Sequence, residues 1–152
     1  MNLQAGMYLV SLSGDEDAMF GHATVFITEH HANGSVGFIV NKLFSRTLNE
    51  LEAFRNSNPI PLYDGGPVDR EHLFFIHRRP DLLAYDIEVG NGIFVGGDFA
   101  TAVRLLNEKI IDHNDIKIFI GYCGWDDTQL EDEIAEEGWL VQQYDADVLF
   151  EP

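Results

Sequence analysis

The stretch ATVFITEHHANGSVGFIVN, residues 23–41, decides the fold that this chain is expected to adopt. Ala23 to His31 and Ser35 to Asn41 have the composition of β-strands, and the dipeptide Asn33-Gly34 between them is typical of tight hairpins. Both segments carry apolar residues on two faces, which is typical of strands at the centre of a covered sheet. The stretch therefore predicts an antiparallel hairpin in the middle of a sheet.

Outside this hairpin, the sequence predicts more strands than helices. Strands are expected at Met7–Leu12, Glu71–His77, Gly92–Val95, Ile116–Ile120 and Trp139–Tyr144. Helices are expected after the capping box Thr47-Leu-Asn-Glu50, through Phe54; after the N-cap Asp98, with an apolar stripe from Phe99 to Ile110; and after Asp126 or Asp127, up to Gly138. Hairpin and crossover connections coexist, which predicts a mixed α+β domain with a mainly antiparallel sheet.

Length and composition indicate one domain over residues 1–152. A chain of 152 residues with 45% hydrophobic residues buries a substantial core, and it contains no repeat or linker-like segment. Its apolar runs are far shorter than the roughly 20 residues that span a bilayer, and no signal peptide is recognisable, so a cytoplasmic location is expected. The single cysteine, Cys123, excludes an internal disulfide framework and a cysteine-rich zinc site.

The charge is strongly negative and uneven. The chain has 26 acidic and 9 basic residues, a formal charge of −17, and no Lys or Arg follows Lys117. Such a surface repels phosphate groups, so neither direct nucleic-acid binding nor membrane contact is expected. The charge permits a basic protein partner, and the alternative is an acidic surface that only keeps the chain soluble.

No assembled catalytic, metal or cofactor site is visible in the sequence. The glycines of residues 90–97 lack the spacing of a dinucleotide fingerprint, and the adjacent His30 and His31 point to opposite faces of a strand. Cys123 lies in Gly121-Tyr-Cys-Gly-Trp125, at an expected strand-to-helix turn, but Trp125 occupies a position where a nucleophile elbow needs a small residue. We therefore expect no catalytic residue, no metal and no cofactor.

Several sequence blocks, in order, resemble the AlgH/YqgE family of small bacterial proteins. They are Gly6-x-x-Leu9, Phe20 with Glu29-His30, Gly34-x-x-Gly37-x-x-x-Asn41, Gly65-Gly66-Pro67-Val68, Gly121-Tyr-Cys-Gly124-Trp125, Gln129-Leu-Glu-x-Glu133 and Trp139-Leu140. Leu43 and Cys123 depart from the family pattern, which often has Pro and a smaller residue there. The resemblance implies an α+β fold whose sheet curls into a partial barrel with flanking helices. Family members are often labelled transcriptional regulators.

The motif residues supply the candidate ligand or partner surface: Asn41, Gly65, Gly66, Pro67, Trp125, Gln129 and Glu133. Two interpretations stay open. In one, the glycines and Pro67 shape turns while the polar amides bond to backbone; in the other, these residues line a pocket.

Three functions from different classes follow from these observations. The preferred hypothesis is a non-catalytic binding or regulatory module that acts through protein–protein contacts. The alternative is a small-ligand-binding protein or enzyme with a pocket near Asn41, Gly65 to Pro67 and Trp125. The third is a transcriptional regulator that acts indirectly rather than by binding DNA. Under the first hypothesis, replacing Glu133, Glu136 and Glu137 with Gln should stabilise the isolated protein slightly and weaken its binding to the partner.

Overall fold

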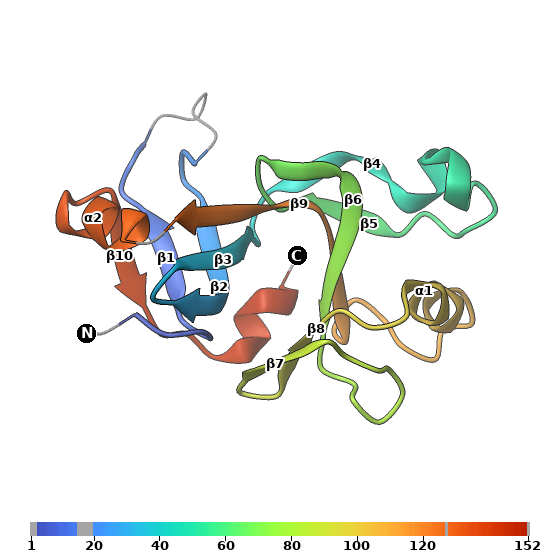
Figure 1. Cartoon of the computed structure of the whole chain (residues 1–152). Coiled ribbons are helices and arrows are strands. Elements are labelled where there is room, and N and C mark those ends of the chain that lie inside the picture. Colours follow the sequence, from blue (N-terminus) through green and yellow to red (C-terminus); the bar gives the residue numbers. More distant parts are fainter. Residues whose placement is uncertain (1–2, 15–19, 127, 152) are drawn as a thin grey trace.

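The computed structural model describes residues 3–14, 20–126 and 128–151 (Figure 1). Its strands are β1 (Tyr8–Ser11), β2 (Thr24–His31), β3 (Gly34–Ile39), β4 (Leu43–Thr47), β5 (Pro61–Asp64), β6 (Val68–His77), β7 (Ile87–Gly90), β8 (Ile93–Val95), β9 (Ile116–Asp126) and β10 (Trp139–Gln142). The α-helices are α1 (Phe99–Asn107) and α2 (Gln129–Ala135), and short 3-10 helices cover Leu48–Glu50, Glu52–Phe54 and Ala146–Phe150. The mainly antiparallel α+β fold is as predicted.

The strands form one sheet in the order β10-β1-β2-β3-β9-β6-β8-β7, with β5 also paired to β9 and β4 paired to β5. Each of these pairings is antiparallel except β5 with β9. The expected partial barrel is wrong, because the strand order is an open path. Closure would need the end strands to pair, but in the described part of the chain β10 pairs only with β1 and β7 only with β8.

Strand β9 joins two lobes, because its two halves pair with different strands. From Cys123 to Asp126 it pairs with β3, and from Ile116 to Tyr122 it pairs with β6 and, in part, with β5. We call β10, β1, β2, β3, α2 and the second half of β9 the first lobe, and β4 to β8, α1 and the first half of β9 the second lobe. The lobes lie at the left and the right of Figure 1, with β9 running between them.

The hairpin of β2 and β3 is confirmed, with a correction to its turn. His31 faces Gly34 across the pair, so the two-residue loop is Ala32-Asn33 rather than Asn33-Gly34. Gly34 begins β3 with φ +152°, and a Cβ there would lie 2.7 Å from the carbonyl oxygen of Trp125. The glycine is needed because β9 passes so close, not because the turn requires it.

Other predicted elements are confirmed in kind but shift in extent. Asp98 caps α1, its carboxylate accepting a hydrogen bond from the Ala100 N–H, as expected. The predicted helix through Phe54 is instead two 3-10 helices, because Leu51 between them is extended (φ −88°, ψ 134°). Helix α2 has Thr128 as its N-cap, Asp126 ends β9, and Asp127 lies outside the described residues.

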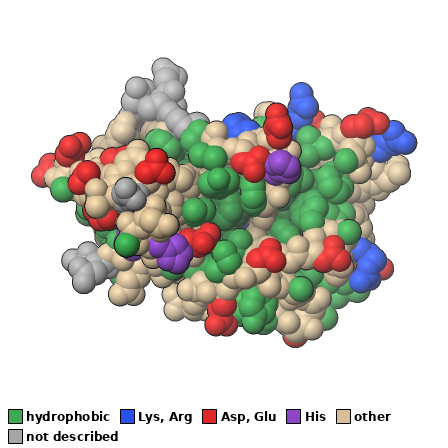
Figure 2. All heavy atoms as spheres, viewed as in Figure 1, with side chains coloured by type: hydrophobic (Ala, Val, Ile, Leu, Met, Phe, Trp, Pro, Cys, Tyr) green, Lys and Arg blue, Asp and Glu red, His purple; other side chains and the backbone are tan. Residues whose placement is uncertain are grey.

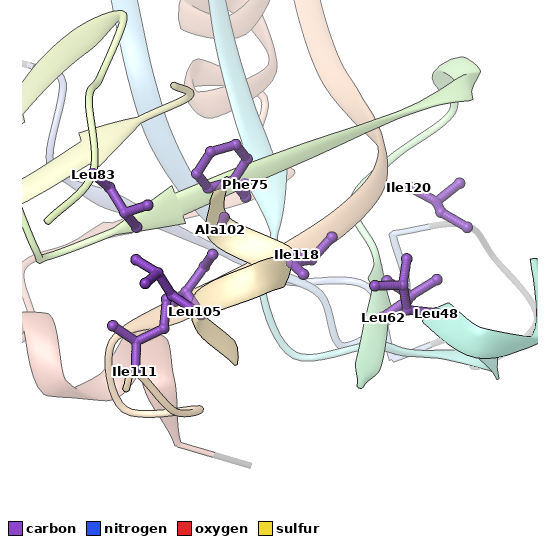
Figure 3. Packing of buried hydrophobic residues seen from close by; sticks show 10 residues of the cluster. Leu48, Leu62, Phe75, Leu83, Ala102, Leu105, Ile111, Ile118 and Ile120 are labelled. Atoms are coloured by element: carbon purple, nitrogen blue, oxygen red, sulfur yellow. The ribbon is translucent and has the colours of Figure 1, made fainter. Parts of the chain in front are cut away.

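The core consists of three clusters of buried side chains that β9 connects. Its alternating residues Ile116, Ile118 and Ile120 belong to a cluster under α1, whose packing Figure 3 shows. Phe119 belongs to a second cluster, and Cys123 and Trp125 belong to a third, beneath α2. Within the described residues, no helix is long and apolar enough to cross a membrane.

Candidate functional site

The carboxylate of Glu133 anchors α2 to the first lobe. Its Oε1 accepts hydrogen bonds from the indole Nε1 of Trp125 at 3.3 Å and of Trp139 at 3.0 Å, and its Oε2 accepts one from Gln129 Nε2 at 3.1 Å. Both indole side chains are buried, and their rings meet edge to face, 6.2 Å apart between centroids. Three of the candidate residues are thus brought together, with Trp139, in a contact that holds a helix.

Gln129 also ties the start of α2 to the end of β9. Its Oε1 accepts a hydrogen bond from the backbone N–H of Asp126 at 3.1 Å, so both ends of its amide are used. For Trp125, Gln129 and Glu133, the structure therefore supports the architectural interpretation.

Gly65 and Gly66 pack directly on the backbone of β9. A Cβ on Gly65 would lie 2.4 Å from the Gly121 carbonyl oxygen, and one on Gly66 would lie 2.3 Å from the Tyr122 carbonyl group. No side chain fits at either position, and the next residue, Pro67, is exposed. These glycines are present because two backbones touch there.

The block from Gly121 to Trp125 lies inside β9, not at the strand-to-helix turn expected from the sequence. Cys123 is 1% exposed and its thiol donates to the Gly65 carbonyl oxygen at 3.4 Å. Burial raises the pKa of this thiol to about 12. A thiol in this setting is neither accessible nor ionised at neutral pH, so it offers no nucleophile.

Asn41 forms hydrogen bonds with the backbone at the end of the β2–β3 pair that lies opposite the hairpin turn. Its Oδ1 accepts from the Thr24 N–H and its Nδ2 donates to the His22 carbonyl oxygen, both at 2.8 Å. Asn41 lines one cavity and Trp125 lines another, and these two cavities share no residue. The structure therefore does not bring Asn41 and Trp125 into one pocket.

The outer surface of α2 and of the residues that follow it is densely acidic. Glu131, Asp132, Glu136 and Glu137 are exposed, and among the described residues their one ion pair joins Glu131 to His30, at 3.9 Å between Oε1 and Nε2. On the face that Figure 2 shows, acidic side chains lie at both ends, whereas the visible Lys and Arg side chains lie away from the α2 end.

The acidic character extends through the sequence of the first lobe. All nine Lys and Arg residues fall between positions 42 and 117, whereas residues 1–41 and 118–144 contain eleven Asp and Glu. The strands and the helix of the first lobe are drawn almost entirely from these two segments. The uneven charge of the sequence thus becomes a division between the two lobes.

His77 is a buried histidine of the second lobe. Its Nε2 lies 3.0 Å from the Ala84 carbonyl oxygen, and its Nδ1 accepts from the Arg79 N–H at 3.1 Å. Both contacts suit the neutral ring with its proton on Nε2, and burial lowers the pKa of this histidine. Among the residues that can be described, no cluster of three or more His, Cys, Asp or Glu side chains is arranged to hold a metal ion.

Lys117 is not among the candidate residues named from the sequence, yet its surroundings are unusual. It is a buried cation, 5% exposed, and it lines an apolar cavity in the second lobe. The available signal was a single lysine between Ile116 and Ile118, in an expected strand whose other residues are all hydrophobic.

Solved structures show the same fold. The solution structure of the AlgH protein from Pseudomonas aeruginosa matches with a TM-score of 0.77 at 23% identity, covering 99% of this chain and 85% of that chain. The crystal structure of protein DIP2367 from Corynebacterium diphtheriae matches with a TM-score of 0.74 at 19% identity, covering 97% and 80%.

Sequence comparisons identify the family. A UPF0301 protein of Chlorobium phaeobacteroides is 33% identical over 148 residues, 97% of this chain and 79% of that protein. A UPF0301 protein of Bacteroides thetaiotaomicron is 34% identical over 140 residues, 91% of this chain and 70% of that protein. The family model described as AlgH-like, DUF179, matches residues 8–152. The resemblance noted in the sequence is confirmed, and the chain belongs to the AlgH-like family.

Proposed function

We propose that this protein is a non-catalytic binding or regulatory module that docks a basic surface of a protein partner. The observation that carries the proposal is the group of exposed carboxylates at α2, in a lobe whose sequence segments contain no Lys or Arg. A partner with clustered Lys and Arg would supply the positive charge that this surface lacks, and complementary charge both speeds association and selects partners.

The acidic charges of α2 are unfavourable for the helix that carries them. Asp132 and Glu136 are like charges at i, i+4 spacing, and Glu136 lies at the C-terminal end of the helix, where the helix dipole disfavours a negative charge. Packing of Leu130 and the Glu133 anchor hold the helix in place despite these terms. Such an arrangement presents fixed negative charges to a partner without requiring the surface to reorganise.

A regulatory role, on this proposal, is exerted through another protein rather than through DNA. A duplex presents a dense row of phosphates, and the first lobe offers no Lys or Arg to neutralise them. We therefore keep indirect transcriptional regulation as one form that the binding function takes.

A matched pair of variants tests the docking face. Asp132→Asn with Glu136→Gln removes two charges from α2, and Glu71→Gln with Glu88→Gln removes two exposed charges from the second lobe. Binding of a lysine-rich peptide at low salt should weaken about fivefold in the first variant and much less in the second. Equal weakening would mean that the peptide senses only net charge, and would leave α2 as an ordinary solvated surface.

A further inference from the structure

A cavity of about 420 Å³ lies in the second lobe, where β5, β9, α1 and the C-terminal 3-10 helix meet. Its walls are mostly apolar and include Pro59 to Pro61, Leu106, Ile118 and Phe150. Ile118, which lies on β9, is labelled in Figure 3. The volume falls within the roughly 300–1,000 Å³ of small-molecule sites, and such sites combine apolar walls with very few polar groups.

The basic side chains of this cavity are His113, which is exposed, and Lys117, which is buried. The Nζ of Lys117 donates to the Val40 carbonyl oxygen at 2.8 Å and lies 4.1 Å from the centroid of the Tyr63 ring. Among the described residues it has no carboxylate within ion-pair distance. Both observed contacts suit a cation, because a carbonyl oxygen and an aromatic face each attract positive charge.

A buried cation without an ion-pair partner is unusual, because removing a charge from water is costly unless an opposite charge compensates it. An ammonium has three N–H donors, and the Val40 carbonyl oxygen occupies one of them. Burial of the ammonium away from water lowers the pKa of Lys117 to about 8. The side chain is therefore still mainly protonated at pH 7. A carboxylate in the cavity would accept a charge-assisted hydrogen bond from this ammonium, in surroundings of low polarity.

We infer that this cavity binds a small amphipathic carboxylate, with its carboxylate on the Lys117 ammonium and its hydrocarbon tail along Pro59 to Pro61, Leu106 and Phe150. This site lies in the lobe opposite α2 and does not depend on the proposed docking function.

A neighbouring cavity supports this placement of the carboxylate. It has a volume of about 470 Å³ and shares Pro61 and Tyr63 as walls with the first cavity. It is lined by the acidic side chain of Glu151, whose charge acts on Lys117 from that side. Like charge therefore disfavours a carboxylate in that neighbouring cavity.

The test is a titration of the whole protein with octanoate, followed by backbone amide NMR shifts, with octanol as a neutral probe of the same chain length. Octanoate should bind saturably and shift the amides of Ile60, Leu62, Tyr63 and residues 116–118. Octanol should bind at least about tenfold more weakly, since the interaction with the charged group is lost. Octanol binding as tightly as octanoate, or octanoate shifts confined to other residues, would overturn the assignment.

Two lysine variants test the same assignment by changing the protein instead of the ligand. Lys117→Met removes the ammonium and should weaken octanoate binding about tenfold, while leaving octanol binding unchanged. Lys109→Met removes the same charge from an exposed position and should change neither. Equal octanoate affinity in both variants would show that Lys117 does not hold the carboxylate. If Lys117→Met does not fold, the comparison of octanoate with octanol on the unaltered protein decides the question.

Discussion

Glu133→Ala should destabilise the protein far more than any other removal of an acid from α2. The substitution takes away the acceptor of two indole N–H groups and leaves the rings of Trp125 and Trp139 buried. Leaving a buried donor without a partner costs about 1–3 kcal/mol, and the 3.3 Å bond belongs at the lower end of that range. The bond to the exposed Gln129 adds little, so we expect a loss of about 3 kcal/mol in the free energy of unfolding.

Urea denaturation followed by tryptophan fluorescence measures this loss at the site itself. Trp125 and Trp139 are the only tryptophans in the chain, so the signal comes from the two rings that Glu133 joins. Glu133→Gln keeps an acceptor oxygen and should lose only about 1 kcal/mol, since a neutral acceptor is weaker than a charged one.

The matched control is Glu136→Ala, an exposed acid that follows the last residue of the same helix. It should change stability by less than about 0.5 kcal/mol, as surface substitutions usually do. A Glu133→Ala variant as stable as Glu136→Ala would refute the anchor. The structure thus corrects the expectation that Glu133, Glu136 and Glu137 are equivalent, because Glu133 holds the helix.

Three further predictions follow from the packing and the buried titratable groups. Gly66→Ala should not yield a stable fold, because its Cβ would lie 2.3 Å from the Tyr122 carbonyl. Gly124→Ala, at an exposed position of β9 where the nearest atom to a Cβ is 3.6 Å away, should remain folded, and circular dichroism of the purified variants compares the two. Cys123 should resist iodoacetamide at pH 7 and react only after denaturation, as intact-mass measurement would show; rapid labelling of the native protein would contradict its burial and raised pKa. Because the pKa of His77 is lowered in the folded state, the unfolded state takes up a proton at higher pH, and the free energy of unfolding should fall as pH drops below about 6.5. In urea titrations at several pH values, His77→Gln should make the free energy of unfolding depend less on pH.

The sequence was informative where local chemistry decides the structure. The hairpin of β2 and β3 follows from two apolar segments around a short polar turn, and the start of α1 follows from the capping carboxylate of Asp98. Each of these signals lies within a few neighbouring residues, so reading along the chain is sufficient.

Local sequence patterns were misleading where a segment distant in the sequence decides the structure. The glycines of the Gly121–Trp125 block suggested a turn, yet the block lies in β9. Gly121 is a glycine because the distant Gly66 carbonyl oxygen would lie 2.3 Å from any Cβ placed there. In the sequence, Glu133 could not be told apart from the other acids of its helix. The indole N–H groups that donate hydrogen bonds to it belong to other elements, β9 and β10. Strands β4, β5 and β7 were also missed, since they are short and mostly exposed or half-buried, which weakens their apolar alternation.

The position of β9 between the lobes also governs how the chain reaches its fold. The strand begins at Ile116, yet its partners β3, β5 and β6 lie between residues 34 and 77, and β1 near the start pairs with β10 near residue 140. Contacts of such long sequence separation slow folding, because the entropy of closing large loops is lost before the pairings form. While the ribosome is still adding the first 115 residues, β3, β5 and β6 have strand edges without β9, and such edges are prone to aggregate. Both lobes therefore wait for the same eleven residues, and the first lobe waits further, until β10 is available to pair with β1.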